Sequence, residues 1–546
     1  MTFAFKPAAR WVANVKSAPL VELSDMDIRK TNPRRISRRR VLRTAASALG
    51  AMATPYLSRA ADRPIITHGV QSGDVGTDGG VVWARSDRPS QMMVEVATTE
   101  SFRNGRALPP IAALPESDFT AKMLVENLPA GQDIFYRLRF RDLSHPEISS
   151  EAVTGRFRTA PADRRDVSFV WGGDVAGQGW GINPDDGGMV TFAAMRKHAP
   201  DFFVHSGDTI YADGIISSEV KLKDGKLWKN LTIPEKAKVA ETLDEFRAAH
   251  RYNLLDENLR AFNAEVPIFV QWDDHEVTNN WSASKVLPEA YRVRDIHLLA
   301  ARAARAFHEM YPMRESIVEP GRVYRALSYG PHLDVFMLDE RSYRGPNGPN
   351  LQTVYGPDCY FLGPDQLHWL KRGLLNSRAT WKVIASDMPL SLIVYDDFAN
   401  RKGSEAFAQG DGPPRGRELE IADLLRFIRD SGVTNTVWLT ADVHYAAAHF
   451  YNPDKAQFQE FMPFWEFVAG PLNAGTFGPN ELDNTFGPEV RFIKAAGPDK
   501  PNLPPSAGMQ FFGHVRIDGA TGQTTVTLRD RADVALWSTT LDPVLG

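Results

Sequence analysis

The strongest constraint on the fold is a regular alternation of short apolar runs and amphipathic segments that begins after Asp166. The clearest amphipathic segments, 365–376 and 416–430, carry leucine or isoleucine at helical spacing, which predicts helices with one buried face. The apolar runs that we interpret as strands are 167–171, 202–205, 266–271, 334–338, 381–385 and 437–439. This order predicts a layered α/β domain over residues 166–546.

The region 61–161 has a different pattern. Short apolar or alternating runs are separated by turn residues; they include 81–83, 92–96 and 135–140. This spacing predicts a small N-terminal antiparallel β-sandwich domain, joined to the α/β domain by the charged segment 163–166. The polar, helix-prone segment 215–262 is inserted between two predicted strands, and we expect it to form a lid over a site.

Residues 1–60 have the features of an export leader. The basic stretch 34–43 precedes an alanine-rich apolar stretch, 44–57, and small residues flank a predicted cleavage point after Ala60. The stretch is too short and too weakly apolar to be a stable membrane anchor. Segment 37–42 resembles a twin-arginine signal, which predicts a periplasmic or secreted protein that uses the twin-arginine export machinery. A basic tail with no export role is the alternative.

The composition narrows the range of functions. The net charge is -4 and no lysine or arginine stripe appears outside the leader, so no nucleic-acid partner is expected. The chain has a single cysteine, Cys359, which excludes an intrachain disulfide. A catalytic thiol is disfavoured because the flanking Pro357 and Tyr360 supply no base.

Four of the predicted strands end in polar clusters, at 172–174, 207–211, 272–276 and 440–444. Any one of these acidic residues alone would be read as a helix cap or a turn former. In an α/β sheet, however, the carboxyl ends of the strands border one crevice. Several carboxylates that converge there would repel each other without cations. Together the four clusters therefore predict a metal site.

These clusters resemble a known catalytic pattern. Its residues in this chain are Asp174, Asp208, Tyr211, Asp274, His275, Glu276, Asp442 and His444. Their order is similar to that of the metallophosphoesterases, including purple acid phosphatases. The leader, the sandwich and the sequence Trp-Asp-Asp-His-Glu-Val-Thr-Asn-Asn-Trp at 272–281 resemble the PhoD family of alkaline phosphatases and phosphodiesterases. The resemblance implies a metallophosphoesterase-like α/β sandwich that hydrolyses phosphate monoesters, diesters or both with a metal-activated water.

The resemblance also implies which residues hold metal ions. Asp208 would bridge two ions, and Asp174, Tyr211 and His444 would complete the site of the first, which is Fe³⁺ in the family. Asp274 and Asp442 would face the second ion.

The chain departs from the wider superfamily at one position of the second site. Residues 386–389, after the predicted strand 381–385, read Ser-Asp-Met-Pro and lack the further histidine ligand. An all-oxygen site suits Ca²⁺ better than Zn²⁺. Asp387 would either replace the missing histidine or cap a turn.

Further residues are candidates for contact with phosphate. His275 would donate a hydrogen bond or a proton, with Glu276 orienting its ring, unless it is a buried structural histidine. Asn279 and Asn280 are candidates for holding phosphate or a metal-bound water. Arg341 or Arg344 would clamp phosphate with a bidentate fork, unless each is a solvated surface arginine.

Two other functions remain open from the sequence. The first is a phospholipase D-like phosphodiesterase that uses the same metals. The second is a non-catalytic, metal-containing binding protein, which is disfavoured because this ligand set leaves room for water.

Overall fold

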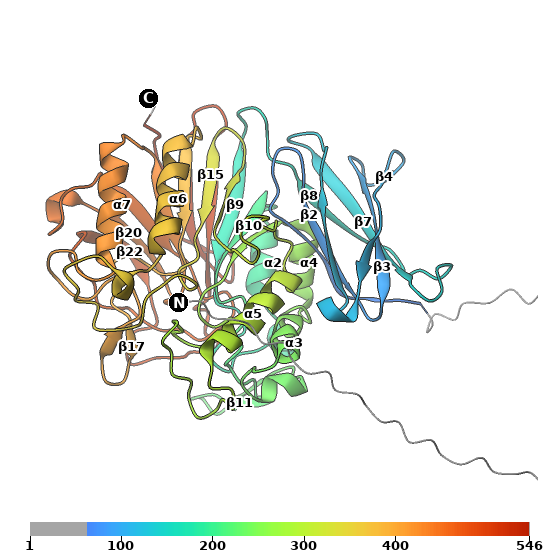
Figure 1. Ribbon diagram of the computed structural model, residues 1–546, viewed down its shortest axis with the longest axis horizontal. Helices are drawn as coiled ribbons and strands as arrows, with labels where there is room; N and C mark the ends of the chain where they lie inside the picture. Colours follow the sequence, from blue (N-terminus) through green and yellow to red (C-terminus); the bar gives the residue numbers. More distant parts are fainter. Residues whose placement is uncertain (1–62, 545–546) are drawn as a thin grey trace, which may run out of the picture. The chain divides into compact units, whose positions relative to one another are not determined.

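The computed structural model describes residues 63–544, whose main feature is a pair of large sheets packed face to face (Figure 1). The predicted leader, its twin-arginine motif and the cleavage point after Ala60 lie outside the described residues. Among residues 63–544, no helix is both long enough and apolar enough to cross a membrane.

The N-terminal strands form a sandwich of two antiparallel layers. Their bounds are β1 Ile66–Gly73, β2 Gly80–Ser86, β3 Ser90–Ala97, β4 Arg106–Ala107, β5 Ile111–Ala113, β6 Thr120–Val125, β7 Asp133–Asp142 and β8 Val153–Arg158. One layer has the order β1-β2-β6, and the other has the order β4-β3-β7-β8, with β5 also paired to β3. Alternate side chains, such as Val94 of β3 and Leu138 of β7, belong to the same hydrophobic core as Val82 of β2.

The first large sheet has nine strands in the order β25-β24-β23-β9-β10-β13-β1-β2-β6. The strands not yet named are β9 Val167–Gly172, β10 Phe202–Ser206, β13 Ile268–Gln271, β23 Phe511–Ile517, β24 Thr524–Asp530 and β25 Ala535–Leu541. Strands β9, β10 and β13 are parallel. β1 also pairs with β13, through Gly73 and Ile268, so one layer of the N-terminal sandwich continues the sheet of the α/β region.

The second large sheet has seven strands in the order β14-β15-β16-β19-β21-β20-β22, and β15, β16, β19 and β21 are parallel. The bounds are β14 Arg325–Ser328, β15 Leu333–Met337, β16 Trp381–Ala385, β19 Thr436–Thr440, β20 Ala446–Tyr451, β21 Phe464–Val468 and β22 Pro488–Lys494. Two separate hairpins are formed by β11 Glu219–Lys221 with β12 Leu227–Lys229, and by β17 Tyr395–Asp397 with β18 Lys402–Ser404.

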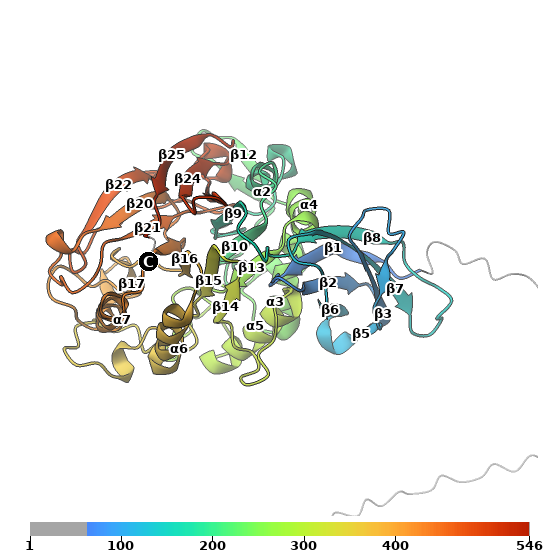
Figure 2. The same cartoon turned by 90° about the horizontal axis from the view of Figure 1, so that it is seen from above.

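Helices cover the outer faces of both sheets. On the nine-stranded sheet lie α2 Val190–Arg196, α3 Leu243–Asn253, α4 Glu257–Glu265 and α5 Ile296–Met310. On the seven-stranded sheet lie α6 Gly363–Asn376 and α7 Glu418–Asp430 (Figure 2). Short 3-10 helices begin with proline at Pro115–Ser117, Pro184–Asp186, Pro234–Ala237, Pro357–Cys359, Pro453–Lys455 and Pro505–Ala507.

The apolar runs of the central strands are explained by burial on both faces. In β15, Val335 and Met337 pack between the two sheets, whereas Phe336 between them packs under α6 and α7. The predicted α/β sandwich with an N-terminal β-sandwich is confirmed. The predicted lid is wrong for α3 and α4, because Phe246 and Phe262 of these helices belong to the core beneath the nine-stranded sheet.

Candidate metal centre

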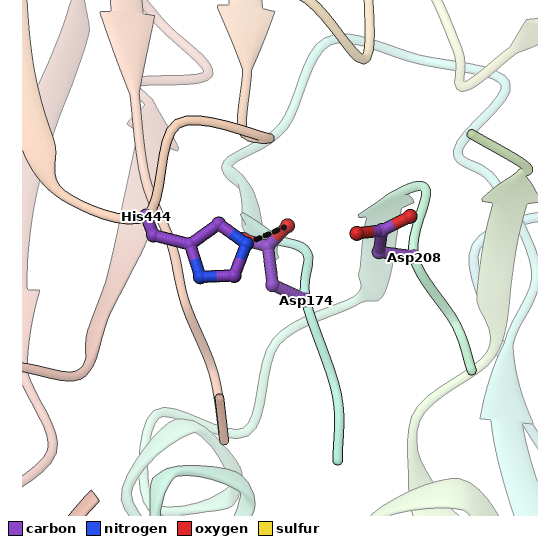
Figure 3. Close-up of side chains that lie close together, drawn as sticks. All are labelled: Asp174, Asp208 and His444. Carbon is purple, nitrogen blue, oxygen red and sulfur yellow. Dashed lines mark ion pairs between the residues drawn. The ribbon is translucent and has the colours of Figure 1, made fainter. Parts of the chain in front are cut away.

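The predicted ligands come together where the parallel strands of both sheets end. Asp174 follows β9, Asp208 follows β10 and Asp274 follows β13, three neighbouring strands of the nine-stranded sheet. Asp442 and His444 follow β19 of the facing sheet. Figure 3 shows Asp174, Asp208 and His444 extending from separate segments toward one another. The two sheets therefore contribute to one site.

The first group of potential ligands consists of Asp174, Asp208 and His444, whose ligand atoms lie within 4.8 Å of one another. His444 Nε2 is 3.6 Å from Asp174 Oδ1 and 2.9 Å from the Tyr211 hydroxyl. His444 Nδ1 contacts the carbonyl oxygen of Gly475, which can only accept a hydrogen bond. Nδ1 therefore carries the proton, and the lone pair of Nε2 points into the site, as a metal ligand requires.

A second set of carboxylates adjoins the first. Asp208, Asp274 and His275 offer ligand atoms within 4.8 Å of one another, as do Asp273, Asp274 and Asp442. Asp208 therefore has ligand atoms near both the first group and Asp274, which is the position that a ligand shared by two ions would need. Sequence reasoning did not include Asp273, although it directly precedes Asp274.

The backbone of this site is strained at the candidate ligands. Asp174, Asp208, Asp442 and His444 have φ values of 67°, 50°, 60° and 62°. Such conformations cost on the order of 1–3 kcal/mol each in residues other than glycine and concentrate at functional sites. Space is also tight, since a Cβ atom on Gly470 would lie 2.2 Å from Asp174 Oδ2.

The electrostatics of the site call for added positive charge. Burial, followed by the neighbouring Asp442, raises the pKa of Asp174 well above its usual value. Burial, followed by Asp274, does the same to the pKa of Asp208. Neither carboxylate oxygen of Asp174 has a hydrogen-bond donor among residues 63–544. Carboxylate, phenol and neutral imidazole groups are metal ligands, so these residues fit bound cations.

Arg341 does not occupy the predicted position of a phosphate clamp. Its side chain is 0% exposed, and its Nε lies 2.6 Å from Asp273 Oδ1 and 3.4 Å from Asp387 Oδ2. Its Nη1 pairs with Glu405. The predicted clamp is wrong because three buried carboxylates already hold this guanidinium. We call Arg341, Asp273, Asp387 and Glu405 the Arg341 cluster.

The surroundings of Arg344 and Asp387 decide between alternatives that the sequence left open for each of them. Arg344 is buried and not a solvated surface residue, and its Nη1 lies 3.0 Å from Glu405 Oε1. No backbone N–H among the described residues donates to the Asp387 side chain, so Asp387 is not a cap. Glu405 was missed because it lies on a loop after β18, far from any predicted motif.

His275 is oriented by Asp213 and not by Glu276. His275 Nδ1 lies 2.7 Å from Asp213 Oδ1, and its ring packs against the Tyr211 ring at 4.2 Å between centroids. Burial lowers the pKa of His275, but Asp213 and then Asp274 outweigh it and raise this pKa to about 10. Sequence reasoning missed Asp213. Its signal was available, because it follows Asp208 and Tyr211 as a third acidic or phenolic side chain within the segment 208–213.

Glu276 has a structural role that corrects the prediction. Its carboxylate accepts hydrogen bonds from the Thr209 backbone and hydroxyl, both at 2.6 Å, and from the Asp273 backbone at 2.8 Å. It therefore joins the loops after β10 and β13, and its side chain makes no hydrogen bond with the His275 ring.

The two candidate asparagines differ in their surroundings. Asn280 Nδ2 donates to the carbonyl oxygen of Asp396 at 3.1 Å, so this amide is engaged by the β17–β18 hairpin. The Asn279 backbone donates to Asp213 Oδ2 at 2.7 Å, and the residue is exposed. No side-chain hydrogen bond of Asn279 is found within the described part of the chain, which makes it the better candidate for a ligand contact.

Comparison with known proteins agrees with this geometry. Residues 169–528 match the model of the PhoD-like phosphatase family, and residues 50–161 match that of its N-terminal domain. The chain belongs to the PhoD-like phosphatase family. As a member of it, the chain is a hydrolase of phosphoric ester bonds. The PhoD resemblance drawn from the sequence motifs is therefore confirmed.

Individual relatives support the same assignment. The chain is 28% identical over 462 residues to alkaline phosphatase D of Bacillus subtilis (strain 168), covering 81% of this chain and 75% of the relative. A solved structure of PhoD matches 90% of both chains with a TM-score of 0.64 and 22% identity. Purple acid phosphatase PPD1 from yellow lupin matches 88% of this chain and 74% of its own with a TM-score of 0.52 and 12% identity, which indicates a shared fold.

Proposed function

We propose that this protein is an exported, metal-dependent phosphoesterase that hydrolyses both phosphate monoesters and phosphate diesters. The observation that carries the proposal is the set of buried carboxylates that meet without a lysine or arginine partner. Among the described residues, the ion-pair contacts of Asp174 and Asp274 are with His444 at 3.6 Å and with His275 at 3.9 Å. We call Asp174, Asp208, Asp274 and Asp442 the open carboxylates.

Two cations are proposed to bind here, with Asp208 as the shared ligand. Asp174, Tyr211 and His444 combine carboxylate, phenol and imidazole, and a deprotonated phenol favours a highly charged ion such as Fe³⁺. Asp274 and Asp442, with the shared Asp208, offer only oxygen atoms, which favours Ca²⁺. When bound, such ions neutralise phosphoryl oxygens and lower the pKa of a coordinated water.

The protein's own residues hold and orient the phosphate group. Asp213 accepts the Nδ1 proton of His275 at 2.7 Å, and although burial lowers the pKa of His275, Asp213 and Asp274 raise it to about 10. The ring is therefore an imidazolium, and Nε2, 3.9 Å from Asp274 Oδ1, carries a second proton that faces the site. From this position, His275 donates a hydrogen bond to a phosphoryl oxygen or a proton to the leaving oxygen. The exposed amide of Asn279 lies on the same loop and is suited to a second contact with the phosphate.

The experiment combines metal analysis with three substrates. Purified protein is assayed on p-nitrophenyl phosphate, bis(p-nitrophenyl) phosphate and phosphatidylcholine. A calcium-selective chelator is expected to abolish hydrolysis while iron stays bound, and added Ca²⁺ is expected to restore it. Tyr211→Phe is expected to remove visible absorption, whereas Asp442→Asn weakens the calcium dependence and keeps the colour. Hydrolysis of phosphatidylcholine alone would favour the phospholipase D-like alternative, and active protein with two zinc ions and no iron would contradict the metal assignment.

Export is tested separately. Replacing Arg38 and Arg39 by lysine is expected to retain uncleaved protein in the cytoplasm, because the twin-arginine pathway depends on this pair. Unchanged activity outside the cytoplasm in this variant would contradict the export proposal and leave the phosphoesterase proposal intact.

A further inference from the structure

A groove on the N-terminal sandwich carries three arginines in a row. Arg137, Arg139 and Arg141 occupy alternate positions of β7 and line a groove of about 400 Å³. Because strand side chains alternate, all three point to the same face. The residues between them, Leu138 and Phe140, are buried in the core against the β1-β2-β6 layer. The arginines therefore project from the outer face of the β4-β3-β7-β8 sheet.

The charge of this groove is not balanced within the protein. Arg137 pairs with Glu95, its Nε lying 3.1 Å from Oε2, and stacks over Phe102. Arg141 Nη2 donates at 2.6 Å to the uncharged amide of Gln91. Arg139 is exposed, and no hydrogen bond or ion pair of its side chain is found among residues 63–544. The lining residues carry three positive charges and one negative charge, on a chain whose net charge is -4.

The spacing of the arginines favours a chain-like ligand over a single anion. With a rise of about 3.4 Å per residue, alternate positions are about 7 Å apart, so the row spans about 14 Å at the backbone. Arg137 and Arg141 contact Glu95 and Gln91, which lie directly opposite them on β3, so their guanidinium groups are held apart and do not gather on one phosphate. A linear molecule with several phosphate groups can contact groups spaced in this way, and the planar guanidinium matches phosphate oxygens.

The other walls of the groove suit the units that link such phosphates. Met93, Leu108 and Pro146 provide apolar surface, and Ser149 provides a hydroxyl group.

We propose that this groove binds a linear polymer of phosphate groups and thereby tethers a polymeric phosphate ester to the enzyme. The tethering role rests on the proposed phosphoesterase function, whereas the binding itself does not. Neutralising two phosphates on a flexible strand gives a log–log salt slope of about -1.4. Each arginine lost is expected to weaken binding about tenfold, since hydrogen bonds to charged groups contribute about 1.5–3 kcal/mol.

Binding is measured by calorimetry with linear polyphosphate as the probe, on a chain that carries Asp208→Asn to prevent hydrolysis. Polyphosphate is expected to bind at least about tenfold more tightly than inorganic phosphate, with the salt slope given above. Adding Arg139→Glu and Arg141→Glu is expected to weaken binding about 100-fold. The matched control adds Arg372→Glu and Arg378→Glu, exposed residues near the end of α6 and beyond it, and is expected to leave binding unchanged.

Equal polyphosphate affinity in the two charge-reversed proteins would overturn the proposal, as would binding no tighter than that of inorganic phosphate. To separate the loss of charge from a disturbance of the sheet by glutamate, Arg139→Gln with Arg141→Gln is measured in parallel and is expected to give a smaller loss of the same sign. With Asp208 restored, the Arg139→Glu, Arg141→Glu enzyme is expected to keep its kcat/KM for p-nitrophenyl phosphate. If the protein with its native residues binds polyphosphate but hydrolyses no phosphate ester, that result would count against the phosphoesterase proposal alone.

Discussion

Asp273 and Asp274 are consecutive residues at the end of β13, both buried, yet their carboxylates have different partners. Asp273 lies in the Arg341 cluster, where a guanidinium contacts three carboxylates. Asp274 is one of the open carboxylates, and its ion-pair contact is with the His275 ring. One set of buried acids is thus paired with a guanidinium of the protein, and the other is the set for which we propose bound cations. Burying negative charge without a partner is strongly unfavourable, so the second arrangement has a functional rather than a stabilising purpose.

The largest expected effect concerns His275, the basic side chain whose raised pKa of about 10 keeps it charged beside the open carboxylates. His275→Ala is expected to lower kcat by about 10²–10⁴-fold, the usual contribution of a positioned acid, while metal content falls little. Kinetics and elemental analysis of the same sample check this. The matched control is His297→Ala, an exposed histidine on α5, with unchanged kcat. A parallel loss of metal would make His275 a ligand.

The Arg341 cluster should respond to the loss of its cation through stability. Arg341→Met leaves Asp273 and Asp387 buried without an ion-pair partner and Glu405 with Arg344 alone, and is expected to lower the free energy of unfolding by about 3–5 kcal/mol. Urea unfolding measures the change. Arg372→Met, at an exposed position of α6, should change it by less than about 0.5 kcal/mol. An equally small effect of Arg341→Met would show that the cluster does not need its arginine.

Asp213 tests whether orientation of His275 matters beyond its presence. Asp213→Asn keeps the size of the side chain but removes the charge that holds Nδ1. The expected loss in kcat is about 10–100-fold, smaller than for His275→Ala, because supporting residues typically contribute that much. KM should change little. In the His275→Ala background, Asp213→Asn should have almost no further effect on kcat, and a full second loss would contradict the orienting role.

The last expected effect is a pH dependence of the metal-free protein. Burial raises the folded pKa of Asp174 above its unfolded value, so its contribution to stability is present at low pH and is lost as pH rises toward the folded pKa. Asp174→Asn removes this titration. Between pH 5 and pH 8, metal-free wild type should lose up to about 1.4 kcal/mol of stability per pH unit relative to the variant. A constant difference in urea midpoint over that range would exclude the effect.

The sequence predicts the open carboxylates well and the Arg341 cluster poorly, for a physical reason. Each open carboxylate follows a strand whose two faces are buried. The apolar run of that strand therefore indicates in the sequence where the acidic residue lies. Glu405 follows a short, separate hairpin, and its ion pair with Arg341 joins two segments that are far apart in the sequence. Arg341 was misassigned because a strand-end arginine near a phosphate site looks the same in sequence whether it faces phosphate or buried acids. Asp213 was missed because sequence cannot show which carboxylate meets the imidazole.

The most direct test of the account is elemental analysis of purified wild-type protein and of Asp208→Asn, performed on samples whose phosphoesterase activity is measured at the same time. The account predicts about two metal ions per wild-type chain, fewer in Asp208→Asn, and activity that disappears when chelation removes the ions and returns when they are restored. Full activity in a wild-type sample that contains no metal would contradict it.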